Sequence, residues 1–227
     1  ECNQREYIHG DDIYFELDDD AILLRGVDSW TPASADEAYT IKYSIGMTDK
    51  EIYDKMNGLF TMTDFSLLDI DNWVDVSLFI QFGRMYDNRW LKNSYYTVNY
   101  NDDGKICIIL WDTDLSFGID WSGNGFTYAF SPYVGITRAE LSELLLKSPD
   151  ITRLLAERWK ELRCEVLKYD NLLSLLEKHK EKIYASGAIL RDDDTNGMIH
   201  DGEDNYDNLQ AYVQEQLRLM DELYLEK

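Results

Sequence analysis

Short apolar segments in the first half of the chain are bounded by acidic or turn-forming residues, which is typical of β-strands. Strands are expected at Ile13–Leu17, Tyr39–Ser44, Tyr95–Tyr100 and Lys105–Leu110. Asn101–Gly104 separates the last two segments with the sequence Asn-Asp-Asp-Gly, a strong signal for a hairpin turn. The start of the first hairpin strand is therefore expected close to the end of the second.

Apolar residues at helical spacing predict helices on both sides of this hairpin. A capping-box sequence at Thr48–Glu51 should start one helix, which runs to about Phe60. A second helix should follow Asp69 and end around Gly83–Tyr86. The C-terminal half is predicted to contain four further helices: Ala139–Lys147, Pro149–Lys168, Leu172–Leu190 and Asn205–Glu226.

This order of elements predicts an α+β fold, in which short strands and a hairpin are followed by a helical bundle. Residues 1–227 are taken as one domain with three parts. Residues 1–118 are expected to form a mixed α/β part that contains the candidate site, 119–138 an irregular loop, and 139–227 the helical part.

The composition is that of a folded, strongly acidic protein. Its 227 residues carry 44 acidic and 22 basic side chains, so 22 − 44 gives a formal charge of −22. Because binding to a phosphate backbone needs surplus Lys and Arg, no nucleic-acid partner is expected. The longest apolar run, Ile106–Trp111, is too short to span a membrane. Cys107 and Cys164 fall in apolar and helical patterns, and both are expected to be small buried residues.

Oxygen-bearing side chains lie where these predicted elements end. Asp87 follows the helix that ends near Gly83, and Asn93 comes six residues later. The hairpin then returns the chain to Asp112 and Asp114. Carboxylate and amide oxygens are the ligands that suit Mg²⁺ or Mn²⁺, so the pattern predicts a divalent metal site. The alternative interpretation is a loop-capping aspartate and two surface acids in a very acidic protein.

The order of these parts is that of protein kinases, in which a catalytic Asp, a metal-binding Asn, a hairpin and a second metal-binding Asp follow one another. Two differences are evident. The Asn comes six residues after Asp87 instead of five, and Met85 and Tyr86 stand where the kinase pattern has histidine and arginine.

Beyond this order, the sequence resembles the spore coat protein H (CotH) kinase-like family. The most specific motif is the sequence Trp-Asp-Thr-Asp-Leu-Ser-Phe-Gly, and the resemblance covers nearly the whole chain. The segments that carry it are Tyr14–Asp18, Ile70–Asp75, the loop from Asp87 to Tyr96, Trp111–Gly118, Leu144–Ile151 and Arg158–Arg163.

The resemblance implies a divergent kinase-like fold that binds ATP with Mg²⁺ or Mn²⁺ and phosphorylates Ser or Thr of proteins. By position, Asp87 corresponds to the catalytic base and Asp112 to the metal ligand of the DFG-like motif. Asn93 corresponds to a second metal ligand, and Asp114 either to a supporting ligand or to a group that contacts the ligands without touching the metal. The resemblance also implies a bacterial protein that is extracellular, on the cell surface or in the spore coat.

The family's N-terminal portion, which covers and clamps ATP, has no counterpart in these residues, and no nucleotide-clamping residue is assigned. The chain therefore resembles the C-terminal lobe of a longer kinase. By itself this lobe is expected to have only weak kinase activity. Its acidity favours basic, Ser-containing protein substrates. Two other functions stay open: a non-catalytic surface or scaffold module derived from a kinase, and a metal-dependent phosphohydrolase.

The acidic segment from residue 192 to 203 matches the twelve-residue loop of an EF-hand without a gap. Helical patterns flank it on both sides, which the motif requires. The segment therefore predicts a structural Ca²⁺ site, and the alternative is a solvated acidic loop between two helices. The expected ligands are Asp192, Asp194, Asn196, Met198 through its carbonyl, and Glu203.

Overall fold

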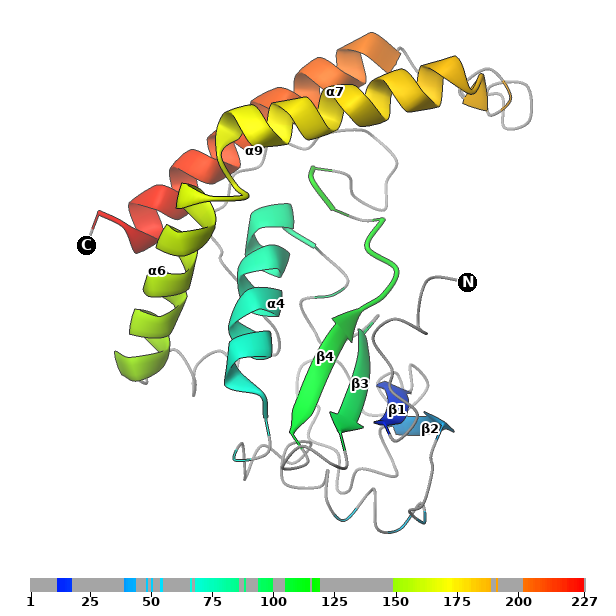
Figure 1. Cartoon of the computed structure of the whole chain (residues 1–227), viewed down its shortest axis with the longest axis vertical. Helices are drawn as coiled ribbons and strands as arrows, with labels where there is room; N and C mark the ends of the chain where they lie inside the picture. Colours follow the sequence, from blue (N-terminus) through cyan, green and yellow to red (C-terminus); the bar gives the residue numbers. More distant parts are fainter. Residues whose placement is uncertain are drawn as a thin grey trace, which may run out of the picture. The chain divides into compact units, whose positions relative to one another are not determined.

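A computed structural model of the chain describes eight regular elements and the segments next to them. Described are residues 12–17, 39–43, 48, 50, 54, 66, 68–85, 88, 94–99, 105–114, 116–118, 149–188, 191 and 202–226. In chain order the elements are β1 (Asp12–Leu17), β2 (Tyr39–Tyr43), α4 (Ile70–Gly83), β3 (Ser94–Asn99), β4 (Ile106–Leu110), α6 (Pro149–Cys164), α7 (Tyr169–Ala185) and α9 (Gly202–Tyr224), as Figure 1 shows.

The chain divides into two compact units. The first contains Glu1–Ile80, Asp87–Thr113 and Gly135–Leu145, and the second contains Gln81–Tyr86, Asp114–Val134 and Leu146–Lys227. Helix α4 contributes its first eleven residues to one unit and its last three to the other. The division into 1–118, 119–138 and 139–227 stays a prediction.

The first unit contains a four-stranded antiparallel sheet with the strand order β2-β1-β3-β4. The four strands confirm the predicted ones to within one residue at every end. In the hairpin of β3 and β4, Ser94 pairs with Leu110 and Val98 with Ile106. The start of β3 therefore lies beside the end of β4, as the hairpin signal predicted.

The outer edge of β4 is covered by the chain that leads into α4. Leu68 forms a parallel bridge with Ile106, whose carbonyl accepts a hydrogen bond from the Asp69 N–H at 2.9 Å. The side-chain amide of Asn72 accepts from the Ile108 N–H at 2.7 Å and donates to the Ile108 carbonyl at 3.2 Å. These bonds satisfy edge groups of β4 that would otherwise be open for pairing.

Helix α4 begins where the sequence predicts. The carboxylate of Asp69 accepts a hydrogen bond from the Asn72 N–H at 2.9 Å, which is the bond that an N-cap side chain makes. Trp73, Val74 and Leu78, all less than 5% exposed, form part of its buried face. The helix ends at Gly83, and Arg84 follows in the left-handed region with a φ of +47°.

Helices α6 and α9 form the core of the second unit. Trp159 is fully buried and contacts Tyr224 of α9, with ring centroids 6.4 Å apart. Its ring N–H donates to the Asp221 carboxylate at 2.9 Å, which Arg163 also binds with two nitrogens at 2.8 and 3.0 Å. The core residues that α6 and α9 contribute are Ile151, Leu155, Trp159, Tyr212, Val213, Leu217 and Met220.

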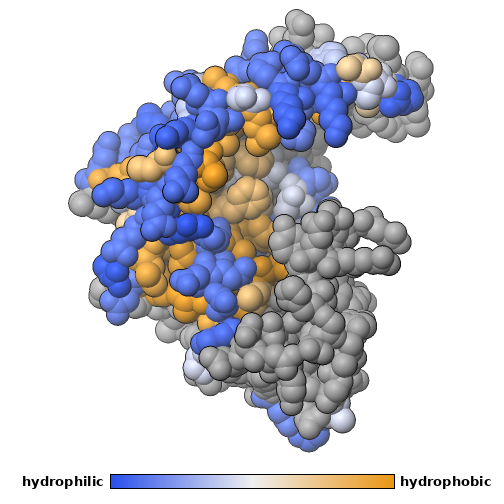
Figure 2. All heavy atoms as spheres, viewed as in Figure 1, coloured by the Kyte–Doolittle hydropathy of each residue, from blue (hydrophilic) through white to orange (hydrophobic). Residues whose placement is uncertain are grey.

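Helix α7 packs beside α9 but has no buried residue among those whose side chains are described. Figure 2 shows hydrophilic side chains over the outer surfaces of α6, α7 and α9, with hydrophobic ones visible between them. Leu175 of α7 is 50% exposed. The apolar pattern of α7 therefore predicts correctly that the segment is helical. It does not predict that the apolar side chains of α7 are more exposed than those of α9.

Several helix boundaries differ from the predictions: α7 begins at Tyr169 instead of Leu172, and α9 covers Gly202–Tyr224 instead of Asn205–Glu226. Two of the early ends have a physical reason. Helix α6 ends at Cys164 instead of Lys168, because the Leu162 carbonyl accepts from the N–H groups of Glu165 and Leu167 and closes a turn there. Arg163 also donates to the Leu167 carbonyl. Helix α7 ends at Ala185 instead of Leu190, and Gly187 follows with a φ of +67°. The prediction that Cys164 is buried is wrong, because it lies exposed at the last helical position of α6.

Candidate functional site

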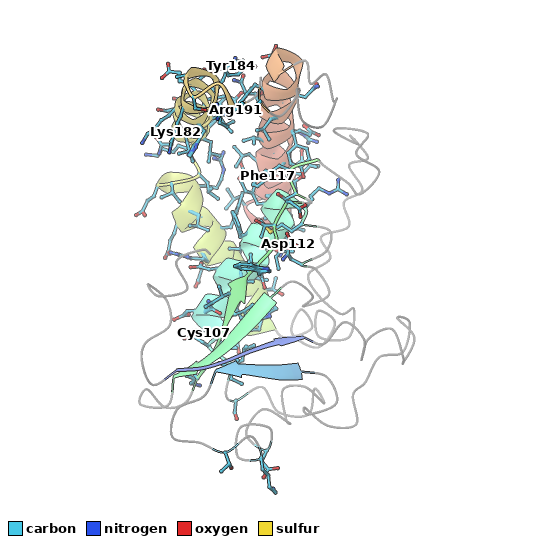
Figure 3. The ribbon with its side chains drawn as sticks, turned by 90° about the vertical axis from the view of Figure 1, so that its right-hand side faces the viewer. Cys107, Asp112, Phe117, Lys182, Tyr184 and Arg191 are labelled. Carbon is cyan, nitrogen blue, oxygen red and sulfur yellow. The ribbon has the colours of Figure 1, made fainter. Side chains whose placement is uncertain are left out.

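Strand β4 ends immediately before the Asp-x-Asp sequence. Asp112 lies two residues after the strand, is exposed, and has a φ of +51° (Figure 3 labels it beyond Cys107 of the strand). Among non-glycine residues, Asp and Asn tolerate this left-handed region best because their short side chains hydrogen-bond locally. Such backbone outliers cluster at functional sites, so the conformation of Asp112 favours a functional interpretation.

Asn88 holds the residue that precedes Asp112. Its side-chain amide donates to the Trp111 carbonyl at 2.8 Å, and Asn88 itself is only 1% exposed. A buried amide that bonds a backbone carbonyl restricts the chain at that point. Asn88 was not among the residues predicted for the site, and its place directly after Asp87 is the only sequence signal for it.

Asp114, in the second unit, begins the turn that ends the Asp-x-Asp sequence. Its carbonyl accepts a hydrogen bond from the Ser116 N–H at 3.0 Å, and Ser116 is buried. The Asp114 side chain is exposed. The Asp114 carboxylate is therefore exposed to solvent, while the Asp114 carbonyl is hydrogen-bonded to the backbone of Ser116.

The structure tests part of the predicted metal site. It confirms the hairpin, which was the reason for expecting Asn93 near Asp112, but Asp87 and Asn93 lie outside the described residues. Within the described part of the chain, no group of three or more His, Cys, Asp or Glu is placed to hold a metal ion. The set of Asp87, Asn93, Asp112 and Asp114 therefore stays a prediction.

The predicted EF-hand loop also lies outside the described residues, because none of 192–201 is described and only the backbone of Glu203 is. Helix α7 ends before this loop and α9 begins at Gly202, inside the predicted motif. The calcium ligands therefore stay a prediction as well.

No helix in the described part of the chain combines the length and apolar character needed to cross a bilayer. This finding agrees with the expectation that the sequence contains no membrane-spanning segment.

Comparison with known protein families gives one match. The sequence model of the family described as CotH kinase protein matches residues 51–220 of this chain, which is well over half of it. The matched range includes both Asp-x-Asp residues and the loop that contains Asp87 and Asn93. No curated protein matches the chain.

Proposed function

The chain belongs to the CotH kinase family, and on this premise we propose that it is the C-terminal catalytic lobe of an atypical protein kinase. The proposed reaction transfers the γ-phosphoryl group of ATP to a Ser or Thr hydroxyl of a protein, with Mg²⁺ or Mn²⁺ present. The fold of the proposed lobe is a divergent form of the kinase C-terminal lobe.

The proposed chemistry assigns one role to each site residue. Asp87 accepts the proton of the substrate hydroxyl. As the hydroxyl oxygen forms a bond to the γ-phosphorus, the bond between that phosphorus and the bridging oxygen of ADP breaks. Asn93, Asp112 and Asp114 hold the divalent cation by their side-chain oxygens. The cation, when bound, neutralises phosphate charge and helps to align the transferred group.

The family match carries this proposal, because one continuous match contains all four assigned residues. The geometry of Asp112 supports it. A charged, exposed side chain stands on a left-handed backbone, and the buried Asn88 holds the residue before it.

Replacing Asp87 or Asp112 by alanine in the full-length kinase, which includes the ATP-clamping part, tests the assigned roles. Asp87→Ala is expected to lower ATP-dependent phosphorylation by about 10²- to 10⁴-fold, the usual contribution of a general base. Asp112→Ala should also lower it strongly, because the proposed metal would lose a ligand. The assay follows phosphate incorporation into basic, Ser-containing peptides by mass spectrometry, with ATP and Mn²⁺. Circular dichroism checks that each variant keeps its helix content.

Asp207→Ala is the matched control, since it removes one exposed carboxylate from α9 without touching the proposed site. It should retain the activity of the unmodified protein. Full activity in both Asp87→Ala and Asp112→Ala would overturn the role assignments. Release of inorganic phosphate without a protein acceptor would indicate a phosphohydrolase instead.

Two finer features belong to the same proposal. The acidic surface, with a formal charge of −22, attracts basic protein segments by long-range electrostatics. Raised ionic strength should therefore increase the KM for a basic peptide more than for a neutral one. We also propose a location on the cell surface or in the spore coat, which immunolabelling of intact cells and spores would test.

A further inference from the structure

The segment that follows Asp114 is anchored at Phe117. Phe117 has a φ of +52°, which is an uncommon backbone conformation for a bulky residue. Its N–H donates to the Gly83 carbonyl at 2.6 Å, and its ring meets Phe82 edge-on with centroids 5.7 Å apart. The last turn of α4 therefore holds Phe117 by its backbone and by its side chain, which explains how the strained conformation persists.

Helix α9 contacts the same aromatic ring. Tyr212 is 1% exposed and meets Phe117 at a near-perpendicular angle of 73°, with ring centroids 6.3 Å apart. Figure 3 shows Phe117 beside this helix. Burial raises the pKa of the Tyr212 phenol above its ordinary range. Phe117 thus lies between the last turn of α4 and the middle of α9.

Helix α9 also fixes the α4 turn through polar contacts. Gln216 donates from its side-chain nitrogen to the Gln81 carbonyl at 3.0 Å, and the Tyr224 hydroxyl donates to the Gln81 side-chain oxygen at 2.7 Å. Gln81 and Gln216 are only 4% and 6% exposed. Buried hydrogen bonds of this kind depend on direction, so they select one arrangement of the last turn of α4 and α9 within the second unit more strictly than apolar contacts do.

We propose that α9 positions Asp114 through Phe117, with Tyr212 and Gln216 as the positioning residues. The proposal rests on the proposed function, in which the Asp114 carboxylate is a metal ligand. The Asp114 carbonyl bonds the N–H of Ser116, the residue before Phe117, so a movement of Phe117 is transmitted to Asp114. A ligand carboxylate has to be held to within about 0.5 Å, which a solvent-exposed turn needs outside support to achieve.

The experiment compares Phe117→Gly with Phe117→Tyr. Glycine adopts the left-handed backbone without strain but removes the ring, whereas tyrosine keeps the ring. Mn²⁺ affinity is measured by electron paramagnetic resonance, and hydrogen exchange is measured at the amide of residue 117. Phe117→Gly should weaken Mn²⁺ binding by about 10- to 100-fold, which is the usual effect of losing an outer-shell support. Phe117→Gly should also speed hydrogen exchange at the amide of residue 117. Phe117→Tyr should keep the Mn²⁺ affinity and the exchange rate of the unmodified protein.

Gln216→Met provides a second variant that keeps the side-chain length and loses the hydrogen bond to Gln81. It should lower Mn²⁺ affinity while leaving the helix content unchanged. Arg163→Lys is the control, because it weakens the bonds to Asp221 of α9 without contacting Phe117 or Gln81. It should lower the melting temperature and leave Mn²⁺ affinity unaltered.

The outcomes separate the two proposals. If the unmodified protein binds Mn²⁺ and Phe117→Gly binds it equally well, the positioning role is wrong and the proposed function stands. Equal losses of Mn²⁺ affinity in Phe117→Gly and Arg163→Lys would also overturn the positioning role, because they would indicate a general effect of lower stability. If the unmodified protein binds no Mn²⁺, the proposed function itself fails, and with it the metal for which Asp114 is positioned.

Discussion

Helix α4 is held at each end by side-chain carboxamides, but the two ends differ in how completely those groups are hydrogen-bonded. In the first unit, Asn72 uses both its oxygen and its nitrogen on Ile108. In the second unit, within the described part of the chain, the side-chain nitrogen of Gln81 and the side-chain oxygen of Gln216 have no hydrogen-bond partner. The fully hydrogen-bonded carboxamide, Asn72, thus connects α4 to the sheet. The incompletely hydrogen-bonded ones, Gln81 and Gln216, connect the last turn of α4 to α9, which we propose positions Asp114 through Phe117.

This difference matters because an unpaired buried polar atom is unfavourable, whereas a fully paired group contributes to stability. Asn72 is therefore expected to be important for stability. Gln81 and Gln216 are expected to contribute little net stability and to act by selecting one geometry. Three substitutions test the comparison.

The largest effect is expected for Asn72→Leu, which is close in shape but cannot hydrogen-bond. It leaves the N–H and carbonyl of the buried Ile108 without this partner, so the free energy of unfolding should fall by about 2–4 kcal/mol. Urea unfolding measures the loss. A loss below about 0.5 kcal/mol in Asn72→Leu would contradict the comparison.

A smaller effect is expected for Tyr224→Phe, which removes the hydrogen bond to Gln81 and should cost about 1 kcal/mol near neutral pH. Burial raises the pKa of Tyr224 from 10.0 to about 12 in the folded protein. Above pH 10 the unfolded chain loses this proton first, so stability present below pH 10 should decline as the pH rises toward 12. Tyr224→Phe should make that decline less steep.

Tyr184→Phe is the control for this pH dependence, because Tyr184 is 40% exposed on α7. Thermal unfolding at a series of pH values from 8 to 12 compares the three proteins. An equal decline in Tyr224→Phe and the unmodified protein would show that Tyr224 loses its proton at the same pH in the folded and unfolded states.

The smallest effect is expected for Gln216→Met. The substitution loses one hydrogen bond to Gln81 but also removes an oxygen that has no partner among the described residues, so the two effects offset each other. Urea unfolding should give a stability within about 1 kcal/mol of the unmodified protein. A loss as large as that of Asn72→Leu would show that incomplete pairing does not distinguish the two ends of α4.

Local sequence signals predicted the elements around the candidate site well. The Asn-Asp-Asp-Gly turn and its flanking apolar segments predicted the hairpin, and the pairing of Ser94 with Leu110 confirms it. Asp69 and the apolar residues after it predicted α4, because a cap and a helical period act within a few residues. The family was identified from the Trp111–Gly118 run and is confirmed by the match over 51–220.

Contacts between distant residues could not be predicted in the same way. Arg163 of α6 donates to the Leu167 carbonyl and binds Asp221, which is 58 residues away in the sequence. Asn88 was not identified, because its partner Trp111 is 23 residues distant and no local pattern connects them. Helices α7 and α9 have similar apolar spacing, yet Leu175 is half exposed and Leu217 is buried.

The sequence by itself determined the strands, the hairpin, helix α4, the strongly acidic charge and the family, since these depend on residues that act locally or on a continuous motif. Only the tertiary structure decided which helix face is buried, which carboxamide is fully paired, and that Phe117 lies between α4 and α9. Burial and hydrogen bonding depend on which surfaces meet after folding, and the spacing of residues along one segment does not specify the partner of that segment.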